Sequence, residues 1–465
     1  MELTPDNVKN PKGVRVPMGL KDFLGDASGT FTLNILSGLV GQLTYFYTDK
    51  IGLAGAAVAN VMLLGQIFDA FADLIMGTVV EHTNVRGEKY RPWLFRMVAP
   101  VLVLTIMLFT VPKGIGSGVQ ILYMLIVNIL LNAIVVVAIE IPYGSLLVVR
   151  TDDQRERSKM GTFRAGAGII SGMIISVGII PITNMLGGDQ KAWIEFASVL
   201  APIAALFLFI CYKTSKEVIT QTDTVKEEKE EEKSTFKEAS VKLVQNKYWL
   251  MAFGLNFLAT IIYSIQGSSG IYYAKWIYKN EDLVGIQGAL GIIPIILGFV
   301  LIGPMIKKFG VTNTIKYVLF LGFISQLLRL INPYNFYYNT ILGVLGGFAT
   351  IPMTALMGVI TAMSIDYNEF KFGKRMIGYA QSINGFGIKI GGGIGLGLIG
   401  WSLSLASYNA QATVLTEAVK QAIFAFNIYA PGIVYLLMFI IIIKFDLENK
   451  LPRFRKESEL KRNER

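Results

Sequence analysis

The stretch that decides the fold is Gln66-Ile-Phe-Asp69-Ala-Phe-Ala-Asp73-Leu-Ile-Met-Gly77, an apolar run that carries two aspartates. Apolar residues continue on both sides, so the run predicts a membrane-spanning helix. Positions four apart share one helix face, and a carboxylate at the centre of such a helix costs about 2.5–3.5 kcal/mol on insertion scales. Asp69 and Asp73 therefore predict a cation site that faces a polar path. The alternative is a helix end whose acids lie in water.

Composition extends this prediction to the whole chain. The 465 residues are 53% hydrophobic and 16% charged, with a mean hydropathy of +0.51, and apolar runs recur along nearly the full length. We predict an all-α polytopic membrane protein. One cysteine (Cys211) and one histidine (His82) argue against a disulfide framework and a metal centre. An enzyme is disfavoured because no nucleophile and base are paired and the loops are too short for a catalytic domain.

Apolar runs of about 20 residues mark the expected helices. They lie near 20–49, 53–80, 92–112, 119–148, 161–187, 192–212, 247–277, 282–306, 312–331, 337–366, 375–405 and 424–445. The arrangement predicts twelve helices in two six-helix bundles, 20–212 and 247–445. An internal repeat is expected, because the connection at 151–164 resembles the connection at 366–379. A charged linker, 213–246, joins them, and tails cover 1–19 and 446–465.

Basic residues set the predicted orientation. Of 43 Lys and Arg residues, 34 fall on the side of the two termini and seven on the other side. The first set includes Arg150, in the loop after the helix 119–148, and the second set includes Arg329. The positive-inside rule then places both termini in the cytoplasm of a cell-membrane protein. The formal charge of +10 follows this distribution and does not indicate nucleic acid. Charges in residues 1–20 argue against a cleavable signal peptide, and we expect a monomer in the lipid bilayer.

Five ionisable residues are expected inside the membrane, and each must pair or be hydrated. They are Asp69, Asp73, Glu140, Arg164 and Lys389, with a formal sum of −1. A net charge of −1 would be neutralised by one bound proton or one bound metal ion. Sodium needs several oxygen ligands, and the residues between the two aspartates, like the valines before Glu140, supply none from their side chains. H+ is therefore favoured over Na+.

Three of these residues have alternative roles. Glu140 and Arg164 are expected to bind the hydroxyls of a sugar, since a carboxylate accepts and a guanidinium donates hydrogen bonds. The alternative is a structural ion pair between their helices. Lys389 lies in a glycine-rich segment that begins at Asn384, and its alternative is snorkelling to the membrane interface.

Several motifs together resemble a known family. They are Tyr47-Thr48-Asp49, Asp69-Ala-Phe-Ala-Asp73-Leu-Ile-Met-Gly77, Arg86-Gly-Glu-Lys-Tyr-Arg-Pro-Trp93, Glu140-Ile-Pro-Tyr-Gly-Ser-Leu146, Thr162-Phe-Arg164 and Asp366-Tyr-Asn-Glu-Phe-Lys371. The chain resembles the glycoside/pentoside/hexuronide cation symporters, the melibiose permease family of the major facilitator superfamily. The resemblance implies two six-helix bundles, a central sugar site and alternating access driven by a cation gradient.

The resemblance also implies roles for individual residues. Asp69 and Asp73 match cation-site aspartates, and Lys389 matches a lysine that couples the cation and sugar sites. Glu140 and Arg164 match sugar contacts. The loop with Arg86, Lys89 and Arg91 matches a cytoplasmic gate.

The sequence departs from the family pattern at several places. Ala72 and Val137 stand where melibiose permease carries an asparagine and a threonine of its sodium site. In melibiose permease the first helix also contacts the sugar, and several residues of this sequence could make that contact. The remaining candidates for substrate contact are Asp26, Thr30, Asn34, Tyr143 and Asn384.

The predicted function is import of a glycoside, pentoside or hexuronide by cation symport. No cofactor is expected beyond the coupling cation. The alternatives are a related transporter of a non-sugar organic anion and, less favoured, a membrane receptor or enzyme.

Overall fold

The computed structural model describes residues 18–83, 85, 88–151, 154–217, 236–373, 376–451, 453 and 454. These residues form helices and no strand, apart from one isolated bridge between Val85 and Glu88. The predicted all-α fold class is therefore confirmed.

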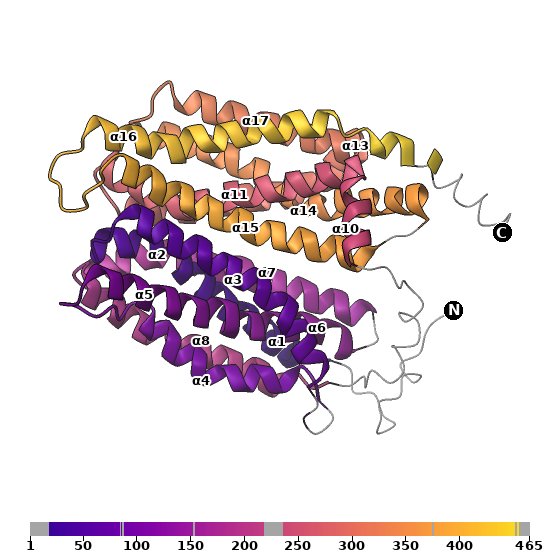
Figure 1. The fold of residues 1–465 in the computed structure, drawn as a ribbon, viewed down its shortest axis with the longest axis horizontal. Coiled ribbons are helices and arrows are strands. Elements are labelled where there is room, and N and C mark those ends of the chain that lie inside the picture. The colour runs from indigo at the N-terminus through magenta and orange to yellow at the C-terminus, as the bar shows by residue number, and fades with distance from the viewer. Residues whose placement is uncertain are drawn as a thin grey trace. The chain divides into compact units, whose positions relative to one another are not determined.

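Helices occupy every range that apolar runs predicted (Figure 1). In the first half they are α1 (Leu20–Gly41), α2 (Leu43–Tyr45), η1 (Phe46–Lys50), α3 (Gly55–Glu81), α4 (Arg91–Met107), α5 (Ser117–Ile129), η2 (Leu130–Val136), α6 (Val137–Val149), α7 (Gln154–Met185) and α8 (Gln190–Thr214). In the second half they are α10 (Phe236–Val244), α11 (Lys247–Trp276), α12 (Leu283–Leu290), α13 (Ile292–Arg329), α14 (Phe336–Phe372), α15 (Ile377–Leu405), α16 (Glu417–Phe424), η3 (Ala425–Tyr429) and α17 (Ala430–Ile443). The η segments are π-helical turns.

The predicted helices 282–306 and 312–331 are joined more closely than the sequence indicated. Helical structure continues through α13, and the break is confined to Gly310, whose φ is 78°. This left-handed conformation favours glycine. A Cβ at Gly310 would also lie 2.8 Å from Oε1 of Glu448, so both backbone and packing require glycine here.

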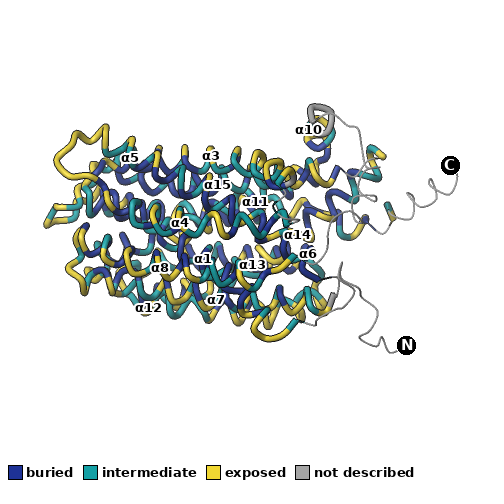
Figure 2. Tube along the Cα trace, turned by 90° about the horizontal axis from the view of Figure 1, so that it is seen from below, coloured by how far each residue is buried: buried dark blue, intermediate teal, exposed yellow. Residues whose placement is uncertain are grey.

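Nine helical stretches within the described residues are long and apolar enough to cross a membrane. The stretch Leu283–Arg329 counts once among them although Gly310 interrupts it, and α1 and α4 fall outside the set. Twelve crossings therefore remain a prediction. Exposed positions run along the helices (Figure 2), and on α3 they include Phe71 and Ile75. Large apolar side chains exposed along a helix fit a surrounding of lipid.

The chain divides into two compact units. The first comprises Met1–Phe46 with Phe68–Glu230, and the second comprises Tyr47–Ile67 with Glu231–Arg465. In the first unit α1 packs against α7 and α8, and in the second α13 packs against α14 and α11 against α15. Tyr47–Ile67 groups with the second unit here, whereas the sequence placed it in the first bundle. The two-bundle boundaries stay a prediction.

A glutamate caps one helix in the same way in each unit. The Glu217 carboxylate accepts hydrogen bonds from the backbone N–H groups of Lys89, Tyr90 and Arg91, the last at 2.8 Å, where α4 begins. In the second unit Glu448 accepts from the backbone N–H groups that follow Gly310, at 2.8 and 2.7 Å. A carboxylate satisfies the N–H groups that a helix start leaves unpaired. Each glutamate follows the last long helix of its unit, which supports the internal repeat.

Candidate functional site

The centre of the site is an ion pair between α1 and α7. Asp26 of α1 is fully buried, and the Arg164 guanidinium of α7 approaches it with two nitrogens. Nε lies 2.6 Å from Oδ2 and Nη2 lies 2.9 Å from Oδ1. This forked geometry is the strongest form of a charge-assisted hydrogen bond. The structure therefore joins two of the predicted substrate residues.

A second guanidinium reaches the same carboxylate. Arg150, which ends α6, lies with Nη1 3.2 Å from Oδ1 of Asp26 and Nη2 3.4 Å from Asp22. It also donates to the carbonyl of Thr214 at 2.7 Å. Its side chain is only 4% exposed, although the sequence counted Arg150 as a solvated loop cation. Buried Asp26 and buried Arg150 carry opposite charges, so the balance of −1 predicted for the intramembrane residues is unchanged.

Tyr143 and Thr30 surround this pair with hydroxyl groups. The Tyr143 hydroxyl donates to the carbonyl of Asp26 at 2.9 Å and lies 2.8 Å from the Thr30 hydroxyl. The Arg164 guanidinium stacks 3.7 Å from the centre of the Tyr143 ring and donates to the Tyr143 carbonyl at 3.0 Å. Cation–π stacking fixes the plane of the guanidinium. The cluster thus has donors and acceptors in defined positions.

Small residues let these side chains approach α1. A Cβ added at Gly29 would lie 2.6 Å from the Tyr143 ring, so only glycine accommodates the ring at this position. On the facing helix, a Cβ at Gly168 would lie 3.6 Å from the amide nitrogen of Asn34 and close to Thr30. Asn34 therefore lies at the interface of α1 and α7, about two turns along α1 from Asp26.

Glu140 does not pair with Arg164 in the structure, because Asp26 takes the guanidinium. Glu140 lies on α6 as an exposed residue. Arg164 therefore has Asp26 as its forked partner, and the role of Glu140 stays a prediction. The sequence could not rank Asp26 above Glu140, because both acids lie in apolar segments.

The predicted cation-site aspartates lie on α3. Asp69 and Asp73 are both partly buried and belong to the first unit. Lys389 and the buried Asn384 lie on α15, in the second unit. Within the described residues, no three His, Cys, Asp or Glu side chains gather in a group that could hold a metal ion.

The predicted gate is described in part. Arg91 donates to the Glu88 carboxylate at 2.8 Å and to the carbonyl of Tyr212 at 2.8 Å, and the backbone of Lys89 is held by Glu217. Arg86 lies outside the described residues. These contacts tie the start of α4 to the end of α8.

Comparisons with known proteins identify the class of the chain. It is 29% identical to the uncharacterized symporter YnaJ of Bacillus subtilis (strain 168), over 92% of each chain. It is 28% identical to the isoprimeverose transporter of Lactiplantibacillus pentosus, over 93% of this chain and 89% of the relative. The crystal structure of the nucleoside transporter NupG has the same fold, with a TM-score of 0.63 at 16% identity, over 92% of this chain and 100% of that chain.

The two relatives and the matching family model are transporters, so the protein is a secondary transporter and not an enzyme. The resemblance to sugar and cation symporters that the motifs carried is confirmed, because a family model described as MFS/sugar transport protein matches most of the chain. The chain belongs to this MFS/sugar transport protein family, through residues 26–449.

Proposed function

We propose that the protein moves an uncharged glycoside or pentoside across the membrane together with a cation. The observation that carries this proposal is the forked pair of Asp26 and Arg164, set among the hydroxyls of Tyr143 and Thr30. Carboxylates accept hydrogen bonds from vicinal hydroxyls, and guanidinium and phenol groups donate them. Such a cluster in an apolar bundle suits a polyhydroxylated solute.

The hydrogen bonds that Arg164 already makes to Asp26 favour an uncharged sugar over an organic anion at this cluster. Two of its nitrogens already hold Asp26, so an anionic substrate would have to displace a buried carboxylate that also contacts Arg150. Displacing it would leave Asp26 buried without its forked partner, which is costly. A neutral sugar can bind through the remaining donors and acceptors without breaking the pair.

The coupling cation is proposed to bind at Asp69 and Asp73, and H+ is favoured over Na+. Two carboxylates on one helix face are suited to share a proton. Ala70, Phe71 and Ala72 lie between them and bring no side-chain oxygen that sodium would need. In this proposal Lys389 couples the cation and sugar sites, and rocking of the two halves gives alternating access.

Counterflow into proteoliposomes tests the substrate class. Vesicles are preloaded with one unlabelled sugar, and entry of labelled glycosides, pentosides, hexuronides and non-sugar organic anions is compared without any gradient. The proposal expects exchange of neutral glycosides or pentosides and its loss in Arg164→Lys, which cannot form the fork. Exchange of organic anions alone, or sugar exchange that Arg164→Lys leaves intact, would contradict it.

A further inference from the structure

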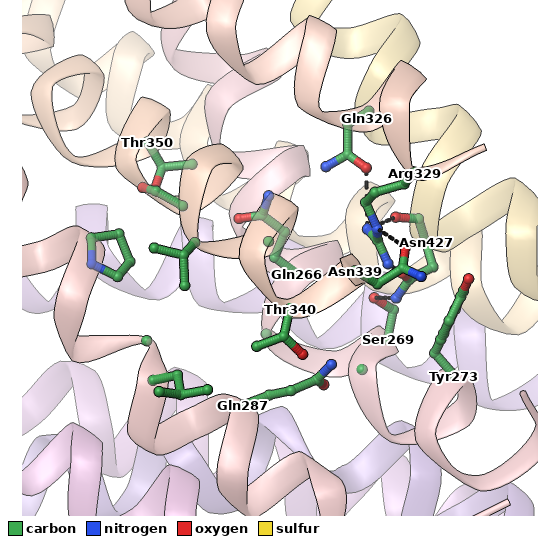
Figure 3. A pocket seen from close by; sticks show the side chains of 18 of the residues that line it. Gln266, Ser269, Tyr273, Gln287, Gln326, Arg329, Asn339, Thr340, Thr350 and Asn427 are labelled. Atoms are coloured by element: carbon green, nitrogen blue, oxygen red, sulfur yellow. Dashed lines mark hydrogen bonds between the residues drawn. The ribbon is translucent and has the colours of Figure 1, made fainter. Parts of the chain in front are cut away.

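The second unit contains a cavity of about 410 Å³ that the predicted site does not include. Residues of α11, α12, α13, α14 and η3 line it (Figure 3). One part of the wall is apolar, with Leu290, Pro294 and Ile351, and another part carries amides and hydroxyls. Cavities of this size and mixed character hold small organic molecules.

Arg329 is the one charged side chain among the described residues that line this cavity. It ends α13, and its hydrogen bonds all go to uncharged oxygens. Nη2 lies 2.6 Å from Oδ1 of Asn427, Nη1 lies 3.1 Å from Oε1 of Gln326, and Nε lies 3.2 Å from Oδ1 of Asn339. Nη1 also donates to the Asn427 carbonyl at 3.2 Å. This carbonyl belongs to the π-helical turn η3, a kind of turn common at functional sites.

The charge of Arg329 lacks a full counter-charge in its surroundings. No carboxylate within the described residues forms an ion pair with it, and its guanidinium lies 5.3 Å from the centre of the Tyr273 ring. Burial raises the pKa of Tyr278 to about 12 against the opposing effect of Arg329, so this phenol stays neutral. The C-terminal end of α13 offsets part of the positive charge. An anion in the cavity would supply the rest.

Two further polar groups of the cavity wall are available to a ligand. The Thr340 hydroxyl is buried and has no hydrogen-bond partner in the part of the chain that the structure describes. The side-chain amide of Gln287 likewise makes no hydrogen bond with described residues. Both side chains point into the cavity that Arg329 lines (Figure 3). Buried polar groups are nearly always satisfied, so the Thr340 hydroxyl calls for a partner that a polar molecule in the cavity would supply.

We propose that this cavity binds a sugar acid, with its carboxylate on Arg329 and its hydroxyls on Thr340 and Gln287. The carboxylate would complete the charge balance and take the guanidinium hydrogen that the amides leave unused. The proposal goes beyond the transport function and does not rest on it, because Asp26 and Arg164 belong to the other unit.

The first test is calorimetric titration of the full chain in an uncharged detergent at low salt, with D-glucuronate and D-glucose as probes. These molecules share ring and hydroxyls and differ in the carboxylate. We expect glucuronate to bind at least about tenfold more tightly, as a direct charge pair implies. Equal affinity for the two probes would overturn the proposal.

Variants locate the binding. Arg329→Gln is expected to remove the preference for glucuronate, whereas Lys307→Gln, which removes an exposed cation from the same helix, is expected to keep it. Because Arg329 also makes hydrogen bonds to Asn427 of η3, its loss can impair folding.

Thr340→Val avoids this difficulty, since it deletes a hydroxyl that bonds to no described residue. It should leave the unfolding temperature unchanged and weaken glucuronate several-fold. Unchanged affinity in Thr340→Val would contradict the assignment.

Anionic lipid is the other source of an oxyanion, and a second titration separates the two. The chain is placed in nanodiscs of phosphatidylcholine with or without phosphatidylglycerol, and glucuronate is titrated into each. Binding in both, with modest competition by phosphatidylglycerol, supports the sugar acid. If glucuronate fails to bind while phosphatidylglycerol stabilises the wild type and not Arg329→Gln, the cavity holds a lipid headgroup and the sugar-acid assignment is wrong.

Discussion

Arg164 holds the buried Asp26 with two nitrogens, at 2.6 and 2.9 Å, across the interface of α1 and α7. Arg150 reaches the same carboxylate at 3.2 Å. Two guanidinium groups therefore share the Asp26 carboxylate. The sequence indicated no partner for this acid. The shared carboxylate fixes the positions of the side chains in the site. Substitutions at this pair should therefore lower the stability of the protein.

Removing the charge of Asp26 should destabilise the protein more than removing the whole pair. Asp26→Asn leaves Arg164 buried without its partner, a change that costs about 3–5 kcal/mol in buried pairs. The double variant Asp26→Asn with Arg164→Gln removes both charges and should recover part of that loss. Thermal unfolding in detergent of the wild type, the two single variants Asp26→Asn and Arg164→Gln, and the double variant measures the difference. A double variant as unstable as the sum of the two single variants would show that the pair is not coupled.

Gly29→Ala should disturb the site through packing alone. The new Cβ would lie 2.6 Å from the Tyr143 ring, and overpacking of this kind costs about 1–3 kcal/mol. Displacement of the ring also moves the group on which Arg164 stacks, so sugar counterflow should fall. Gly41→Ala is the matched control on the same helix, because its Cβ meets no atom within 4 Å. Equal effects of the two substitutions would refute the role assigned to Gly29.

The two capping glutamates should contribute similarly to stability. Glu217→Gln and Glu448→Gln keep one oxygen acceptor but lose the charge that favours a helix start, so each should cost about 1–2 kcal/mol in unfolding free energy. Glu195→Gln is the control, since Glu195 forms only an exposed pair with Lys191, and such pairs contribute little. A loss in one capping variant without the other would weaken the inference of repeated halves.

Asp73→Asn should separate accumulation from exchange. The substitution keeps the size of the side chain but cannot bind a cation by charge, so uphill uptake driven by a gradient should disappear. Counterflow of the same sugar, which needs no net cation movement, should persist. Uphill uptake retained by Asp73→Asn would exclude this aspartate from the coupling site.

The positions of the helices were predictable because apolar runs long enough to span a membrane have few alternatives. The break at Gly310 was placed only as a gap between two helices, since a single positive φ carries no signal in hydropathy. The family was likewise predictable, because each motif that indicates it is a short contiguous stretch of sequence. Sequence patterns therefore defined the class of fold and the family.

The partners of the charged side chains were harder to predict. Arg150 was counted in a solvated loop because it follows an apolar run directly, yet its side chain is 4% exposed and reaches Asp26. Arg329 was counted with cations outside the membrane, although it lines the cavity of the second unit. Glu217 lies at the edge of a charged linker that resembles a solvated segment. Each of these contacts joins helices far apart in the chain, and such pairings depend on packing that periodicity does not encode.

In the proposed transport cycle a cation gradient drives sugar accumulation, with H+ as the favoured cation. The most direct test is uptake of a labelled glycoside or pentoside that shows counterflow, into proteoliposomes with an imposed pH gradient or, separately, a sodium gradient. The account predicts accumulation above equilibrium when the exterior is acidic and none with sodium alone. Accumulation that requires sodium would contradict the preference for H+, and no accumulation under either gradient would contradict cation symport.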